Sequence, residues 1–195
     1  MKPKNKLLLA LLGIIFLSPV SAYAHTGMGH TVGFANGFGH PLGGLDHILA
    51  MIAVGIWAFQ TGGKAVWAMP AAFVGVMALG GFFGIAGVGV PFTEEGIIIS
   101  VLLLGVLIAV VVRMPLVINM AIVGLFAVFH GHAHGIEMPV VAFGLAYGVG
   151  FVVSTALLHL CGIGIGVLFQ KTVSMRFVRY TGASIATAGV YLFLA

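Results

Sequence analysis

The sequence predicts an all-α membrane protein that crosses the bilayer six times. Of its 195 residues, 61% are hydrophobic and only 6% are charged, whereas roughly 25% of the residues in soluble domains are charged. A chain this apolar could not cover a water-soluble domain of its size without large patches that aggregate. Apolar stretches long enough to span a bilayer as helices recur along the chain. Together these observations exclude a soluble globular domain.

The first 24 residues have the pattern of a cleavable signal peptide. Three lysines precede a short apolar stretch, and Ala-Tyr-Ala over 22–24 matches a small-x-small cleavage site. We therefore expect a signal peptide over 1–24 and a membrane domain over 25–195. The alternative is an uncleaved signal anchor, which also places residue 25 on the outer side of the membrane.

Six apolar segments follow the signal peptide, and each is read as one helical span. The last long apolar stretch, 138–169, exceeds the thickness of a bilayer core as one helix, so we expect it to bend at the glycines of 162–166. Glycines elsewhere predict close helix packing, as in 80–84, 144–148 and 182–186. The expected spans are 41–60, 65–86, 96–112, 115–134, 138–161 and 177–195.

The basic residues predict the orientation of these spans. If the mature N-terminus lies outside, the inner loops hold every remaining Lys and Arg and the outer loops hold none. This asymmetry follows the positive-inside rule and predicts a protein with both termini outside. The basic residues form no stripe that could follow phosphates, so nucleic acid is not an expected partner. They are Lys64, Arg113, Lys171, Arg176 and Arg179.

A first polar cluster begins the first predicted span. On one continuous helix, His40 and His47 would share a face about 10 Å apart along the axis. Asp46 lies beside His47 in the sequence, and Met51 would continue the same face one turn deeper. A carboxylate inside a span costs roughly 2.5 to 3.5 kcal/mol, so Asp46 indicates a functional site.

A second polar cluster ends the fourth predicted span. On a helix, His130, His134 and Glu137 line one face, while His132 points elsewhere. The interspersed glycines leave an extended segment open as an alternative, and in that case the three histidines would share a side. Three histidines and a carboxylate within eight residues indicate metal binding rather than a solvated loop.

Both clusters fall in the outer third of the membrane, so we expect them to converge on one divalent metal ion. The single cysteine, Cys161, excludes a thiolate cluster. Neutral imidazoles with two carboxylates suit first-row dications, but ligand type alone does not separate nickel from cobalt, copper or zinc. The expected ligands are His40, Asp46, His47, His130, His134 and Glu137. Further candidates are His132, Met51, His25 and His30 near the mature N-terminus, and His159 near the cytoplasmic side, with Cys161 close to it in sequence.

The two clusters resemble the motifs of a known family. The pattern H-x5-D-H from His40 and the pattern F-H-G-x-A-H-G-x-E from Phe129 are similar to those of the HupE/UreJ nickel permeases. The resemblance covers essentially the whole chain. It implies a secondary permease of the bacterial inner membrane, not an enzyme, that supplies nickel or cobalt for urease or hydrogenase maturation. It also implies that the six residues named above handle the metal.

The sequence also constrains the mechanism. The P-loop pattern is absent, because Gly62-Gly63-Lys64 is followed by Ala65, so we expect no ATP hydrolysis. A dication moving inward gains roughly 4.6 kcal/mol per 100 mV, which favours a uniporter driven by the membrane potential. The expected partners are the metal ion, as transported substrate, and the lipid bilayer. A second copy of the chain and a cytoplasmic metallochaperone are further candidates, and no prosthetic group is expected.

Two other classes of protein use similar residues. In an intramembrane zinc hydrolase, three histidines would hold the metal and a carboxylate would activate water. In a haem-binding electron carrier, histidines on facing spans would be axial ligands, but the two carboxylates would then have no role. Metal uptake into sealed vesicles separates a permease from a hydrolase, and visible absorbance identifies haem.

Overall fold

A computed structural model describes residues 33–138 and 144–195 of the chain. The signal-peptide prediction and the candidate ligands His25 and His30 lie outside the described residues.

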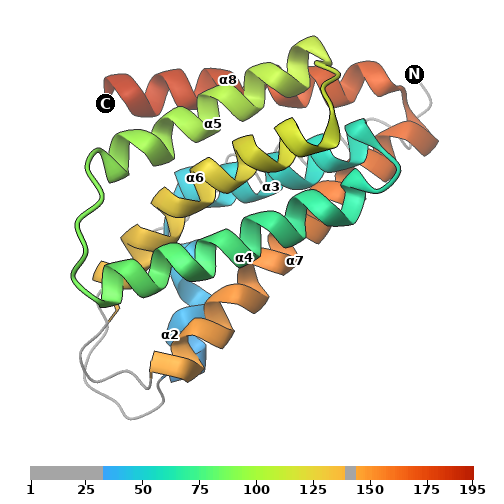
Figure 1. The fold of residues 1–195 in the computed structure, drawn as a ribbon. Coiled ribbons are helices and arrows are strands. Elements are labelled where there is room, and N and C mark those ends of the chain that lie inside the picture. Colours follow the sequence, from blue (N-terminus) through green and yellow to red (C-terminus); the bar gives the residue numbers. More distant parts are fainter. Residues whose placement is uncertain (1–32, 139–143) are drawn as a thin grey trace.

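The described part of the chain is all-helical, as predicted, with seven α-helices and one short 3-10 helix. The helices run back and forth as a bundle (Figure 1). They are α2 (Gly33–Gly39), η1 (His40–Leu42), α3 (Leu45–Thr61), α4 (Ala65–Ile85), α5 (Thr93–Val110), α6 (Leu116–Ile136), α7 (Gly144–Thr172) and α8 (Met175–Leu194).

The first predicted helix, 41–60, is not continuous. The segment α2–η1 meets α3 at an angle of 82°. Pro41 fixes the backbone of η1, and Gly44 takes an extended conformation just before α3 begins. The prediction that His40 and His47 share one helix face is therefore wrong, because His40 precedes the break and His47 follows it.

The predicted bend at 162–166 is also wrong, because α7 continues as one helix to Thr172. Two of the glycines pack against α3 instead of breaking the helix. A Cβ at Gly162 would collide with the backbone of Ile52, and a Cβ at Gly166 would collide with the ring of Phe59. The glycines allow α7 to lie close to α3, and this packing stabilises the helix across them.

Glycines bring other helix pairs together as predicted. A Cβ at Gly80 of α4 would lie 2.6 Å from the Val128 carbonyl oxygen of α6. A Cβ at Gly182 of α8 would lie 2.7 Å from the Ala109 nitrogen of α5. Gly148 differs, because a Cβ there would meet no atom of the described residues within 4 Å. Close packing therefore explains the glycines of 80–84 and 182–186, and does not explain Gly148.

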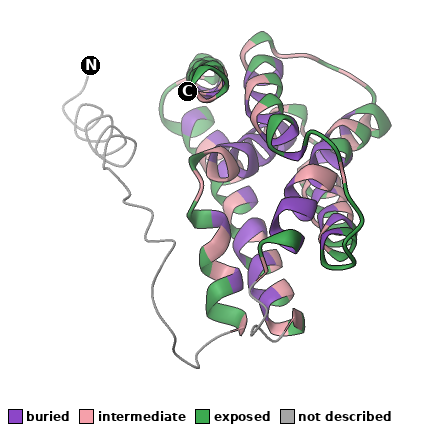
Figure 2. Ribbon diagram, turned by 90° about the vertical axis from the view of Figure 1, so that its left-hand side faces the viewer, coloured by how far each residue is buried: buried purple, intermediate pink, exposed green. Residues whose placement is uncertain are grey.

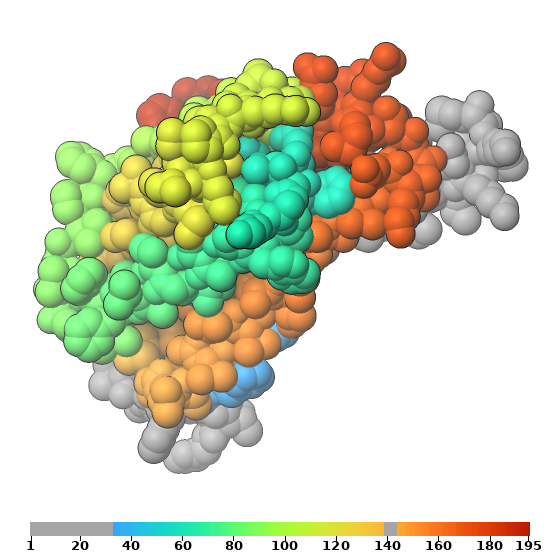
Figure 3. Space-filling model, turned by 45° about the vertical axis from the view of Figure 1, so that its right-hand side comes forward, coloured from blue at the N-terminus to red at the C-terminus, as the bar shows by residue number. Residues whose placement is uncertain are grey.

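Four helices, α4 to α7, are long and apolar enough to cross a membrane, and the bent α2–α3 pair is a fifth candidate. Buried residues face the inside of the bundle and exposed residues face outward (Figure 2). Large apolar side chains such as Trp67 and Phe82 are among those exposed. Figure 3 shows α4 and α7 side by side on one face. Six spans and an outward N-terminus remain predictions.

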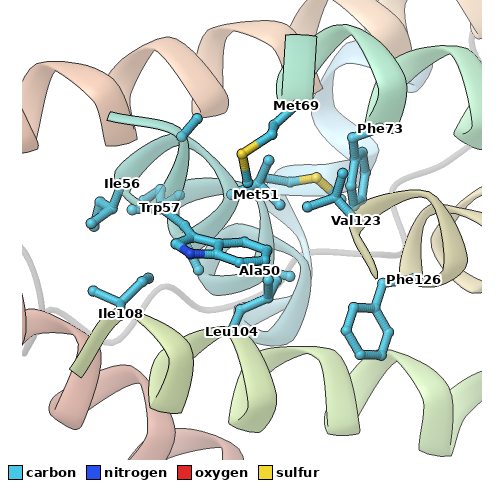
Figure 4. Packing of buried hydrophobic residues seen from close by; sticks show 14 of the residues in the cluster. Ala50, Met51, Ile56, Trp57, Met69, Phe73, Leu104, Ile108, Val123 and Phe126 are labelled. Carbon is cyan, nitrogen blue, oxygen red and sulfur yellow. The ribbon is translucent and has the colours of Figure 1, made fainter. Parts of the chain in front are cut away.

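The basic residues and the two polar clusters lie at opposite ends of the bundle. Every Lys and Arg of the described ranges lies near the α3–α4, α5–α6 or α7–α8 junction, at the right of Figure 1. The two polar clusters lie at the start of α3 and the end of α6, which are at the other end. Between the two ends lies an apolar core that includes Met51, Trp57, Phe73 and Leu104 (Figure 4).

Candidate metal site

The residues of both polar clusters meet at one end of the bundle. His40 lies in η1, His47 in the first turn of α3, and His130 and His134 in the last turns of α6. The segment 130–136 is helical, so of the two conformations open from the sequence the helix is the one observed. Glu137 follows as the C-cap residue of α6.

Glu137 and His40 form the most exposed part of the site. Glu137 Oε2 lies 2.8 Å from His40 Nε2. One ligand atom from each of His40, His134 and Glu137 lies within 4.8 Å of the others. Small side-chain movements would let these three groups bind one ion, since a first-row metal holds imidazole nitrogens at about 2.0 to 2.1 Å.

Asp46 orients His47. Asp46 Oδ1 accepts a hydrogen bond from the His47 backbone N–H at 2.7 Å and lies 2.9 Å from His47 Nδ1. Since an ionised carboxylate only accepts, Nδ1 carries the proton and Nε2 presents its lone pair. A Cβ at Gly44 would lie 2.5 Å from this carboxylate oxygen, so glycine leaves room for the Asp46 side chain.

Ser100 of α5 orients His130 in a similar way. The Ser100 hydroxyl donates to the Ile97 carbonyl oxygen at 2.6 Å, and its oxygen lies 3.0 Å from His130 Nε2. Because the hydroxyl proton is already used, His130 Nε2–H is the donor in the second contact. His130 Nδ1 therefore keeps its lone pair for a ligand.

His134 lies at the centre of the imidazole cluster. Its ring centroid is 4.6 Å from that of His40 and 4.5 Å from that of His47. The ring of Phe151 from α7 covers it at 4.1 Å. The His130 ring lies 4.8 Å from that of His47 and completes the cluster.

Several buried nitrogens of this cluster have no hydrogen-bond partner among the described residues. They are His47 Nε2, His130 Nδ1 and both ring nitrogens of His134. Buried polar groups are normally paired, so several orphaned nitrogens in one place need an explanation. A metal ion among them would use their lone pairs, and the carboxylates of Asp46 and Glu137 would balance its charge. The residues present therefore fit a divalent metal.

The remaining candidate ligands lie elsewhere. His132 connects α6 to the α4–α5 loop, with its ring 3.0 Å from Thr93 Oγ1 and 2.9 Å from the Val88 carbonyl oxygen. Met51 lies in the apolar core beside Met69 (Figure 4). His159 is buried near the middle of α7, not toward the basic end of the bundle where the sequence predicted it, because α7 continues to Thr172. Cys161 is exposed on the same helix.

Sequence reasoning missed Ser100, Tyr147 and Phe151. Ser100 left a signal, because it is the one polar residue between Glu95 and the end of α5. No sequence pattern pointed to the aromatic residues of α7. The ring of Phe151 covers His134, and the ring of Tyr147 lies 5.9 Å from that of His40. Both contacts depend on how α7 packs against the site.

Comparisons with known proteins agree with the site's motifs. The family model described as HupE / UreJ protein matches residues 12–192. Protein HupE of Rhizobium leguminosarum bv. viciae is 45% identical over 174 residues, which cover 89% of this chain and 91% of that protein. No solved structure matches. Because the family model covers nearly the whole chain, this protein belongs to the HupE/UreJ family.

Proposed function

We propose that this protein is a secondary permease that moves a divalent transition metal, nickel first and cobalt second, from the periplasm to the cytoplasm. The observation that carries the proposal is a set of buried imidazole nitrogens that two distant motifs bring together and that have no partner among the described residues. Membership of the HupE/UreJ family supports a role in metal supply for hydrogenase or urease. The zinc hydrolase alternative gains no support from the comparisons.

The exposure of the site residues supports a path inward. The side chains of Glu137, His40 and His47 are 54%, 29% and 12% exposed. His134 and His130 follow at 3% and 0%. A hydrated cation would thus meet a carboxylate first and exchange water for imidazole nitrogen as it moves toward the core. Ligand replacement in steps avoids the cost of stripping the whole hydration shell at once.

The energy for uptake comes from the membrane potential in this proposal. No P-loop is present, and a dication gains roughly 4.6 kcal/mol per 100 mV on moving inward. The basic residues at the opposite end of the bundle favour that end as the cytoplasmic one. The site would then open toward the periplasm, where the metal is captured.

Uptake into sealed vesicles tests the proposal. Full-length protein is reconstituted with an enclosed Ni²⁺ indicator, and an inside-negative potential is imposed. Wild-type vesicles should accumulate Ni²⁺, and His134→Ala should reduce the initial rate about tenfold or more, because it removes the central ligand. Thr187→Ala, which changes an exposed side chain of α8, is the matched control and should retain the rate. Wild-type vesicles that take up no Ni²⁺, Co²⁺ or Zn²⁺ would refute transport.

A further inference from the structure

His159 of α7 is the one histidine of the described ranges that is buried, unpaired and outside the metal site. It is 1% exposed. Neither of its ring nitrogens has a hydrogen-bond partner among the described residues. A buried imidazole with two unused nitrogens is expensive in an apolar interior, and packing alone would be served better by Leu or Phe.

His159 lies beyond the metal site in the inward direction. Its backbone packs against Gly55 of α3, which is eight residues, or about 12 Å, along the helix from His47. It also lies eight residues, or about 12 Å, along α7 from Phe151, which covers His134. Measured along either helix, His159 therefore lies about 12 Å further into the bundle than the metal site.

One aromatic ring, that of Phe73, is shared by His159 and the outer cluster. The Phe73 centroid lies 5.6 Å from the His130 ring and 5.1 Å from the His159 ring. His130 is the deepest ligand of the outer site, so the ring of Phe73 packs against both that site and His159. A rotation of Phe73 would let an ion leave His130 and reach His159 without crossing a purely apolar layer.

One further donor group lies one helical turn from His159, and another lies in the core beside Phe73. Thr155 precedes it by one turn on the same face of α7, and helical side chains lean toward the preceding turn. Thr155 is 0% exposed, and its hydroxyl has no partner among the described residues. The thioether of Met51 belongs to the core cluster that also contains Phe73 (Figure 4). One imidazole and one hydroxyl make a weaker donor set than the outer cluster, and the Met51 thioether beside Phe73 would add only a soft neutral donor.

We propose that His159 is the ligand of a second, inner metal station, through which the divalent ion passes after it leaves His130. This inference rests on the proposed function and adds a residue to it. A site with fewer ligands and no carboxylate holds the ion weakly, and weak binding is what an ion needs in order to move on. The station would take the same class of cargo, a first-row dication that accepts nitrogen and sulfur ligands.

Variants of His159 separate a ligand from a packing role. His159→Phe keeps an aromatic ring and removes the donor, whereas His159→Cys is smaller and keeps a donor. We expect the Phe variant to lose about tenfold or more in Ni²⁺ uptake and the Cys variant to stay within about threefold of wild type. Ser154→Ala, another buried polar change on α7, is the matched control and should leave uptake unchanged. If His159 only fills space, the Phe variant should retain more Ni²⁺ uptake than the Cys variant. That result would overturn the inference.

A binding measurement tests the station without transport. Cys161→Ala removes the native thiol, so that adding His159→Cys to it gives a protein whose sole thiol lies at the proposed station. Co²⁺ added to this purified double variant should give a thiolate-to-metal band in the near ultraviolet that the Cys161→Ala protein lacks. Its absence at saturating Co²⁺ would overturn the inner station. If wild-type vesicles transport no metal but the band appears, the proposed function fails and the second site stands.

Discussion

His40 and Glu137 lie 97 positions apart in the chain, and their side chains meet with 2.8 Å between Nε2 and Oε2. The break before α3 permits this contact, because η1 turns 82° away from the α3 axis and His40 lies beside Glu137 and His134. The bend thus brings the two motifs into one site, with a carboxylate and an imidazole on its exposed side.

Removing the charge of Glu137 should weaken capture of the ion. Glu137→Gln retains an oxygen that can accept from His40 but no longer attracts a dication. We expect the Ni²⁺ concentration for half-maximal uptake to rise about tenfold, with a smaller change in maximal rate. Vesicle uptake over a range of Ni²⁺ concentrations measures both. Glu95→Gln removes an exposed carboxylate of α5 and should leave both values unchanged. If the two variants had equal effects, Glu137 would act only as one of several surface charges and not as a metal ligand.

Ser100 should set the affinity of the site without binding metal. In Ser100→Ala, His130 Nε2 loses its hydrogen-bond acceptor and the ring is no longer fixed with Nδ1 toward the cluster. We expect a loss of about 10-fold to 100-fold in Ni²⁺ affinity, measured by calorimetry on the purified protein. Ser100→Thr keeps the hydroxyl and should recover most of that affinity. If the Ser100→Ala protein binds Ni²⁺ as tightly as wild type, contacts other than that with Ser100 orient His130.

Much of this architecture could be predicted from the sequence. The helix periodicity predicted that His130 and His134 share a face while His132 points elsewhere, and the structure agrees. The rarity of polar residues in the spans singled out both clusters before any fold was known. These inferences succeeded because they depend on local geometry and on the cost of polar groups in lipid.

Other features depend on packing between helices and could not be predicted in this way. Pro41 suited the start of a helix, so the sequence favoured one continuous span where the chain bends. Gly162 and Gly166 indicated a bend because their partners on α3 were unknown. The covering of His134 by Phe151 is a tertiary contact between helices far apart in sequence.

The motif glycine Gly131 should be required for stability. A Cβ there would collide with the Met77 carbonyl of α4, so Gly131→Ala pushes two tightly packed helices apart. We expect a loss of about 1 to 3 kcal/mol and a lower Tm in detergent. Gly148→Ala adds the same methyl where a Cβ meets no atom of the described part of the chain within 4 Å, and it should raise Tm slightly because Ala favours the helix. A Tm that falls equally in both variants would contradict this account of α4–α6 packing.

A double-mutant cycle of Ni²⁺ binding tests whether both motifs bind one ion. His47 comes from the first motif and His134 from the second, and their ring centroids are 4.5 Å apart. Calorimetry on wild type, His47→Ala, His134→Ala and the double variant should give a coupling of about 0.5 to 3 kcal/mol, with the double variant losing less affinity than the two single losses added together. Strictly additive losses, or two binding events that each disappear with one variant, would mean that the motifs bind separate ions.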